Sequence, residues 1–209
     1  MKATNNPDKD TNMTAQLTTL TCGESTISSP DKALVLQFAK LVLGGDQVKV
    51  AANSAVPAIG TYWEGQGGVY AGLMRGEDRH PDYHLIVPTA AAVLGVKLAW
   101  GGHGTETSDC TFRRDGMANT IALMEGDHPA AQFCANLEVE GHGDLYLPAI
   151  SELALCMANV PDLFEKEWHW SSTQRSAYGA FGVDFGDGLQ SGGVKYGELR
   201  VRPVRRLPI

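Results

Sequence analysis

The sequence predicts an α+β fold in which twisted antiparallel sheets combine with two helices and long irregular loops. Its 209 residues are 43% hydrophobic and 20% charged, which supplies enough apolar material for a core and excludes disorder over the whole chain. The 24 glycines exceed the average share of about 7% and indicate many tight turns. Short strand-like runs stand before and after two stretches of helical periodicity, and this order is typical of α+β domains.

The chain divides into three segments. Residues 1–20 are rich in Asn, Asp and Thr and are expected to form a flexible polar arm. In the N-terminal segment 21–59, the run 30–43 is predicted to be a helix, because Ser29 can cap it, Pro30 stands in its first turn and two glycines follow it. This helix is apolar nearly all round, so we expect it to be buried in its own chain or to form an assembly contact. Residues 60–209 form the main domain.

Four strands are predicted in the main domain. Glycines and alternating apolar residues indicate a pair of strands at 67–74 and 83–87, with a charged, turn-rich connection between them. The same alternation at 181–185 and 199–202 predicts two strands near the end of the chain. Between the pairs, residues 101–116 show no periodicity and are predicted to form a long loop.

Two amphipathic helices are predicted between these strands, each with apolar residues at the i, i+3, i+4, i+7 spacing. The first has Asp127 as its N-cap and an apolar face made of Ala130, Phe133, Cys134 and Leu137. The second follows Pro148 and has an apolar face made of Ile150, Leu153, Ala154 and Met157.

The last predicted strand places charge beside the core. Its alternation turns Val201 toward the core and leaves Arg200 and Arg202 on the other face. We expect these arginines to form ion pairs with acidic loop residues such as Asp184 or Asp187.

The charge and hydropathy of the chain exclude several classes of partner. With 17 Lys and Arg against 24 Asp and Glu, the net charge of −7 argues against a general nucleic-acid or anionic-membrane binder. No apolar run approaches the ~18–20 residues of a membrane helix, so no membrane insertion is expected. The first residues lack the apolar stretch of a secretory signal, and we therefore expect synthesis in a cytoplasm without a signal peptide.

The four cysteines form no C-x-x-C pair, so a zinc ribbon or a thioredoxin-like site finds no support. Cys134 and Cys156 fall within apolar helical patterns and are predicted to be core residues.

Catalytic and metal sites are also weakly supported. The loop residues His103, Glu106 and Asp109, or the pair His142 and Asp144, offer metal-ligating side chains, but neither spacing matches a known ligand pattern. Ser171 or Ser172 beside His169 is the one nucleophile arrangement in the sequence, and no G-x-S-x-G motif accompanies it. We therefore expect no enzymatic activity, no cofactor and no metal ion.

An ordered set of short motifs runs from residue 144 to residue 205: Asp144 to Pro148, Trp170 to Thr173, Val183 to Gly188, and Arg200 to Arg205. This order resembles the C-terminal domain of the Legionella collagen-like adhesin, a domain that is common in phage-encoded proteins. That family has a C-type-lectin-like fold, which it shares with the variable proteins of diversity-generating retroelements. The resemblance implies a C-type-lectin-like fold for residues 60–209.

The resemblance also implies a function. It indicates a non-enzymatic module that binds a ligand or receptor, as a virion or tail-associated attachment protein of a bacteriophage. The alternative is a decoration or assembly protein of the phage particle that uses the same fold without binding a ligand. The implied partners are a cell-surface glycan or protein receptor, or other phage structural proteins, and the chain is expected to form a homo-oligomer or part of a larger assembly.

In the retroelement variable proteins, the stretch corresponding to residues 168–196 displays the binding residues on a rigid scaffold. Carried over by position, the candidates for ligand binding are His169, Gln174, Arg175, Tyr178, Gln190, Lys195 and Tyr196. Tyrosine and arginine suit this role because they combine a large contact area with a polar tip.

Overall fold

The computed structural model describes residues 18–22, 25–29, 56–76 and 81–209, which fall into two units divided after Ala55. In the first unit, β1 (Thr18–Cys22) and β2 (Ser25–Ser29) pair as an antiparallel hairpin, which the sequence did not predict. The expected helix over 30–43 and the polar arm up to residue 17 lie outside the described residues. The second unit, Val56–Ile209, is a mixed α+β structure, as predicted.

A four-stranded antiparallel sheet forms one side of the second unit, in the order β11-β5-β4-β3. Its strands are β3 (Tyr62–Trp63), β4 (Gly68–Met74), β5 (Tyr83–Pro88) and β11 (Arg205–Pro208). The pairing of Val69 with Val87 confirms the strand pair predicted at 67–74 and 83–87.

The other sheet has five strands, in the order β6-β10-β7-β8-β9. They are β6 (Lys97–Ala99), β7 (Trp168–Gln174), β8 (Gly179–Asp184), β9 (Gln190–Val194) and β10 (Glu198–Arg200). The neighbours are antiparallel except β10 and β7, which run parallel. The strands predicted at 181–185 and 199–202 correspond to β8 and β10.

The described residues contain three α-helices, one more than predicted, together with the 3₁₀ turns η1 (Ala91–Val93) and η2 (Pro161–Leu163). The helices are α2 (Gly116–Leu123), α3 (Pro129–Ala135) and α4 (Ile150–Asn159). Helix α3 begins after His128 rather than Asp127, because Pro129 occupies its first turn, and it ends before Leu137. Over the ranges that the structure covers, no helix has the length and apolar character needed to cross a membrane.

Helix α2 is the helix that the sequence did not predict. Asp115 caps it, since its Oδ1 accepts a hydrogen bond of 2.9 Å from the amide of Ala118. Tertiary contacts add to this cap: Asn119 is buried and bonds both backbone groups of Phe112, and the Thr120 hydroxyl bonds the backbone of Leu147. The predicted loop therefore ends at Asp115, one residue earlier than expected.

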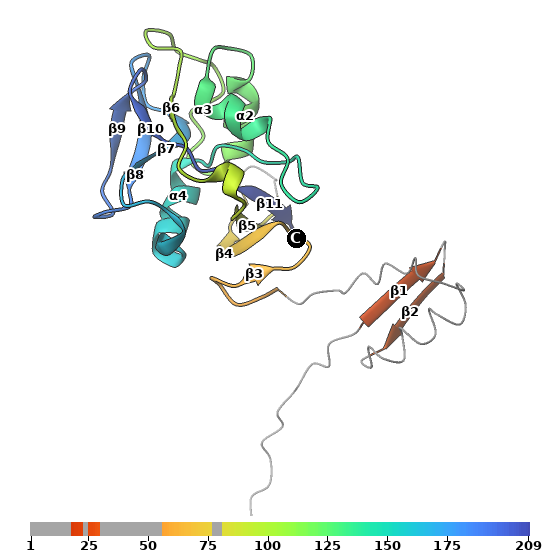
Figure 1. Cartoon of the computed structure of the whole chain (residues 1–209). Coiled ribbons are helices and arrows are strands. Elements are labelled where there is room, and N and C mark those ends of the chain that lie inside the picture. The colour runs from red at the N-terminus through yellow and green to blue at the C-terminus, as the bar shows by residue number, and fades with distance from the viewer. Residues whose placement is uncertain (1–17, 23–24, 30–55, 77–80) are drawn as a thin grey trace, which may run out of the picture. The chain divides into compact units, whose positions relative to one another are not determined.

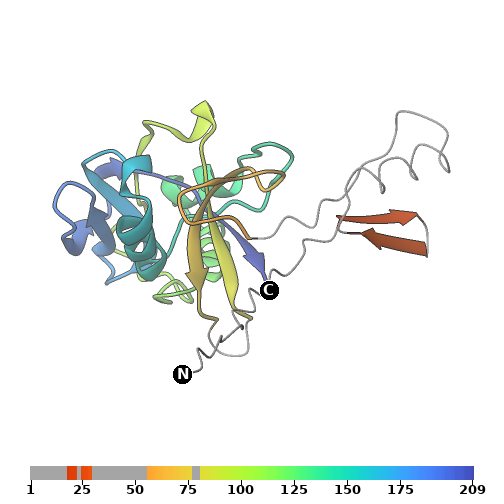
Figure 2. The ribbon, with the colours of Figure 1, turned by 90° about the horizontal axis from the view of Figure 1, so that it is seen from below.

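Helix α4 contacts strands of both sheets, and Figures 1 and 2 place it between them. Its Leu153 and Cys156 belong to a core cluster that joins β4, β5 and β8. A second cluster joins α2 and α3, which lie side by side in Figure 1, to the inner face of the five-stranded sheet through Trp100 and Trp170. Cys134 and Cys156 are both fully buried in these clusters, which confirms their prediction as core residues.

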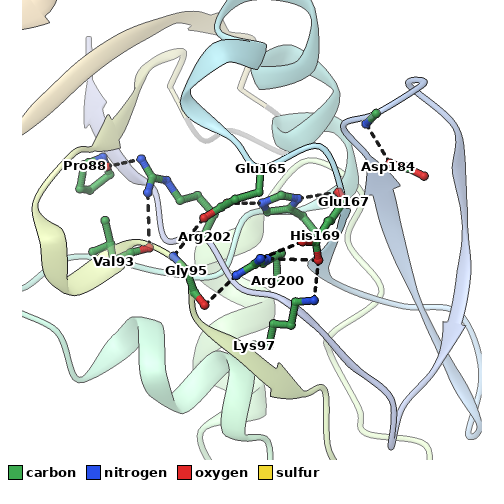
Figure 3. Close-up of polar contacts among 11 residues, drawn as sticks. Pro88, Val93, Gly95, Lys97, Glu165, Glu167, His169, Asp184, Arg200 and Arg202 are labelled. Carbon is green, nitrogen blue, oxygen red and sulfur yellow. Dashed lines mark hydrogen bonds and ion pairs between the residues drawn. The ribbon is translucent and has the colours of Figure 1, made fainter.

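The arginines on either side of Val201 have different partners from those predicted. Val201 is buried in the core, as expected. Arg200 forms an ion pair of 2.8 Å with Glu167, the residue directly before β7, and not with Asp184 or Asp187 (Figure 3).

Arg202 is only 2% exposed, and its guanidinium lies over the ring of Phe164. It donates to the carbonyl oxygens of Pro88 and Val93, at 2.9 and 3.4 Å (Figure 3). The prediction of an acidic loop partner for this arginine was wrong, because β10 is an inner strand and the chain after it enters the core.

A buried carboxyl group organises the start of α4. Glu152 is fully buried, and its Oε1 accepts hydrogen bonds of 2.6 Å from both the Tyr83 and Tyr146 hydroxyls. Its Oε2 accepts a bond of 2.6 Å from the amide of Ala149, which would otherwise be unpaired at the helix N-terminus. Burial raises the pKa of Glu152 to about 7, although the hydrogen bonds act to lower it.

This raised pKa predicts a defined pH dependence of stability. Between the ordinary pKa of 4.5 and about 7, the folded chain holds a proton on Glu152 that the unfolded chain has released. The contribution is therefore fully present below pH 4.5 and lost as the pH rises through about 7, with a size on the order of 3 kcal/mol. Urea unfolding of the wild type and of Glu152→Gln at pH 4.5 and pH 8 measures it. Parallel pH profiles for the two proteins would contradict the assignment.

Candidate binding site

The structure divides the seven predicted binding residues into two groups. His169, Gln174 and Lys195 are buried, whereas Arg175, Tyr178, Gln190 and Tyr196 are exposed. Only the second group presents its side chains to a ligand in this structure.

His169 lies inside a polar and aromatic cluster. Its ring stands edge-on to the rings of Phe164 and Phe185. Its Nδ1 lies 2.9 Å from the carbonyl oxygen of Glu167, and its Nε2 lies 3.2 Å from a carboxylate oxygen of Glu165 (Figure 3). Burial lowers the pKa of the imidazole. Both ring nitrogens are engaged, so His169 holds β7 against the segment before it.

Lys195 and Gln174 together hold the long loop. The Nζ of Lys195 donates to the carbonyl oxygen of Thr105 at 2.8 Å and to Oε1 of Gln174 at 2.7 Å. The amide of Gln174 also bonds both backbone groups of Thr107, at 3.0 Å each. The ammonium group lies 4.6 Å from the ring centre of Trp100, and burial lowers its pKa. These contacts hold the loop in place at Thr105 and Thr107.

Replacing Lys195 by methionine is expected to lower the free energy of unfolding by about 1–3 kcal/mol, because buried acceptors lose a charged donor. Amide exchange at Thr105 and Thr107 should rise with it, since the loop loses its anchor. Lys97→Met is the matched control: this half-exposed lysine pairs with Glu167 at the surface, where its loss should cost under about 1 kcal/mol. Equal effects of the two substitutions would refute the anchoring role.

Close in the chain to Thr105, Gln174 and Lys195, three exposed aromatic rings form a group that we term the aromatic platform: His103, Tyr178 and Tyr196. Tyr178 and Tyr196 are 61% and 66% exposed. The ring of His103 contacts both, with centroid distances of 5.3 Å to Tyr178 and 4.9 Å to Tyr196, in edge-to-face geometry. The platform therefore joins three segments that are far apart in the sequence.

Backbone hydrogen bonds hold these three segments together. The amide of Lys195 donates to the carbonyl oxygen of Tyr178 at 3.0 Å, and the amide of Gly101 donates to that of Lys195 at 3.1 Å. The amide of Gly104 donates to the carbonyl oxygen of Ala177 at 2.9 Å. Gly101 and Gly104 both have a positive φ, and a Cβ at Gly101 would stand 2.1 Å from the carbonyl oxygen of Asp127. The rings are thus exposed on a backbone that is fixed.

The remaining exposed candidates lie apart from the platform. Arg175 turns toward the ring of Phe181, 6.0 Å from its centre. Gln190 pairs with Val183 at one end of the β8–β9 ladder. Val194, which is close to Tyr196 in the chain, lies at the other end. Their part in ligand binding stays a prediction.

The long loop at 101–115 also borders a groove of about 720 Å³, which it shares with residues of α2. Its lining includes the exposed apolar residues Phe112 and Ile121. It also includes residues with hydroxyl and carboxyl groups: Thr105, Glu106, Thr107, Ser108, Asp109, Glu125 and Asp127. Asp109 has a φ of 57°, a left-handed conformation that is uncommon outside glycine.

Several of the metal-ligating and nucleophilic candidates have other partners in the fold. Within the described part of the chain, no three His, Cys, Asp or Glu side chains are placed to hold a metal ion. Of the metal candidates, Asp144 forms an ion pair with Arg205. The Ser171 hydroxyl donates to the carbonyl oxygen of Phe181, and the Ser172 hydroxyl accepts from the Asn119 amide. These contacts stabilise β7 and its neighbours.

The sequence placed Tyr178 and Tyr196 among the binding residues but assigned His103 only to a metal site. The Gly101-Gly102-His103-Gly104 run was the signal that could have found it, since an aromatic ring among glycines stands free of neighbouring side chains. A scan of protein-family models and a search of curated proteins found no match to this chain.

Proposed function

We propose that this chain is a non-enzymatic binding module that contacts a surface ligand or receptor through the aromatic platform. One observation carries the proposal: two tyrosines more than 60% exposed are held in ring contact with His103 on a hydrogen-bonded backbone. Exposed aromatic residues that are already ordered lose little conformational entropy on binding, which makes them good anchors.

We further propose a C-type-lectin-like fold for the unit Val56–Ile209 and a place in a bacteriophage particle as an attachment protein. The support is the ordered set of motifs between residues 144 and 205, together with the two sheets around α4 and the long loop at 101–115. The two platform tyrosines, Tyr178 and Tyr196, lie in the part of the sequence where the resembling variable proteins display their binding residues.

Binding to bacterial cells tests this function. The labelled full chain, added to a panel of bacterial strains, should bind at least one strain saturably, and unlabelled chain should compete. The double variant Tyr178→Ala/Tyr196→Ala should lose at least 90% of this signal. The matched control Leu73→Ala/Leu189→Ala removes two exposed apolar side chains away from the platform and should bind as the wild type does.

The alternative function, a decoration or assembly protein of the particle, predicts a different outcome. The double platform variant would then bind cells as well as the wild type, or no strain would be bound at all. Incorporation into particles would instead depend on residues 1–45, whose deletion would release the protein from them.

A further inference from the structure

The surroundings of the aromatic platform restrict what it can bind. The residues next in the chain to its three rings are Gly102, Gly104, Ala177, Gly179, Lys195 and Gly197. Four are glycines, one is alanine, and the lysine is buried beneath. Beyond them, the exposed apolar side chain nearest in the chain is that of Val194, which is 49% exposed and pairs with Gly179.

A protein partner needs a broader surface than this. A stable protein interface covers about 800 Å² on each side and has an apolar core surrounded by further packed side chains. The platform offers three rings with Val194 beside them instead. Such rings match a small amphipathic ligand that lays one flat apolar face on them.

A sugar ring has this shape. One face of a pyranose presents C–H groups, which stack on aromatic rings, while hydroxyl groups surround its edge. The tyrosine hydroxyls and the backbone groups between the glycines can exchange hydrogen bonds with that edge. Both tyrosines are exposed enough for their ring faces to be covered by a ligand.

The groove on the other side of the loop continues this chemistry. Its volume of about 720 Å³ falls within the range of small-ligand sites. Three hydroxyl and four carboxyl side chains border it, and carboxylates accept hydrogen bonds from sugar hydroxyls. Gly102, which precedes the platform residue His103, and Thr105, two residues after it, both line the groove, so the groove and the platform share one stretch of the loop.

The charge of the groove selects among sugars. No Lys or Arg lines it, and in the described part of the chain none of its carboxylates forms an ion pair. Its one imidazole, that of His128, is buried, and burial lowers its pKa. The buried Lys195, on which Glu106 acts electrostatically, offsets part of the charge of the four carboxylates, and an anionic sugar would still meet net negative charge there.

We propose, on the basis of the function proposed above, that the ligand is a neutral oligosaccharide. One ring stacks on Tyr178 and Tyr196, and the next residues of the glycan enter the groove beside the loop. Sialylated, sulfated and uronic acid-containing glycans are excluded by the groove carboxylates.

An array of defined oligosaccharides tests this proposal with the full chain. Binding is expected to neutral members, and the sialylated form of a bound glycan should bind at least tenfold more weakly. Tyr178→Ala/Tyr196→Ala should reduce binding to the neutral glycan at least tenfold. Thermal unfolding of each variant shows that it is folded.

A charge variant tests whether the groove carboxylates cause the discrimination between neutral and sialylated glycans, a ratio that a loss of stability alone would not change. Glu106→Gln/Asp109→Asn should reduce the discrimination against the sialylated glycan at least threefold, and Asn tolerates the left-handed conformation at position 109. The matched control Glu138→Gln/Asp162→Asn changes net charge equally, at exposed positions outside the groove, and should leave the discrimination unchanged.

Periodate treatment of cells separates this inference from the proposed function. If cell binding depends on the platform but survives periodate oxidation of surface sugars, the ligand is not a glycan and only the oligosaccharide proposal falls. Preferential binding to anionic glycans would overturn it as well. If cell binding does not depend on the platform, the proposed function falls, and this inference with it.

Discussion

Replacing Glu152 by alanine is expected to lower the free energy of unfolding by about 3–5 kcal/mol at pH 5. The substitution leaves the Tyr146 hydroxyl and the Ala149 amide without their acceptor in a fully buried site, whereas the Tyr83 hydroxyl keeps the carbonyl oxygen of Arg114 as an acceptor. Each unsatisfied buried polar group costs roughly 1–3 kcal/mol, and the lost volume adds to this. The effect is a large part of the roughly 5–15 kcal/mol that a domain of this kind has.

Two further variants show that the hydrogen bonds cause this loss. Glu152→Gln keeps an oxygen for the two tyrosines but places an amide donor opposite the Ala149 amide, so a smaller loss of about 1–3 kcal/mol is expected. Asp162→Ala removes an exposed carboxyl group of η2 and should change stability by less than about 0.5 kcal/mol. Urea unfolding measures all three. A loss below about 1 kcal/mol for Glu152→Ala would mean that this network does not stabilise the fold.

The second large effect is expected in binding. Tyr178→Ala and Tyr196→Ala should each weaken binding to the ligand-bearing cells by about 30-fold, since a central aromatic anchor contributes roughly 2 kcal/mol. The free energy of unfolding should change by less than about 0.5 kcal/mol, because both side chains are largely exposed. Titration of labelled chain on cells gives the dissociation constants.

Substitution by phenylalanine separates the ring from the hydroxyl group. Tyr178→Phe and Tyr196→Phe keep the stacking face, so binding should fall by no more than about threefold. His103→Ala should have an intermediate effect, since His103 supports both tyrosine rings through edge contacts worth roughly 0.5–1.5 kcal/mol. If the Phe variants lose as much binding as the Ala variants, the rings do not carry the interaction.

The elements with clear local signals were predictable from the sequence. The strand pair β4–β5 has apolar alternation and glycine boundaries, and α4 has a four-residue apolar face after a proline. Helix α2 lacks such a face, and its Asn119 and Thr120 turn inward to bond the backbones of Phe112 and Leu147. Only tertiary structure provides those partners, so periodicity could not reveal this helix.

The candidate site was predictable only in part, for a related reason. Tyr178 and Tyr196 were found by position, but their contact with His103 depends on three chain segments meeting. Lys195 was expected at the surface because lysine is almost never fully buried without partners. The structure supplies those partners from Thr105 and Gln174, which lie far away in the sequence.

Tyrosine footprinting of the bound chain tests the central claim most directly. The full chain is exposed to hydroxyl radicals when free and when bound to cells, and the oxidation of each tyrosine is read by mass spectrometry. The proposed function predicts that Tyr178 and Tyr196 are oxidised readily in the free chain and are strongly protected in the bound chain. Bound chain in which both tyrosines react as fast as in the free protein would contradict the proposal that the aromatic platform is the binding surface.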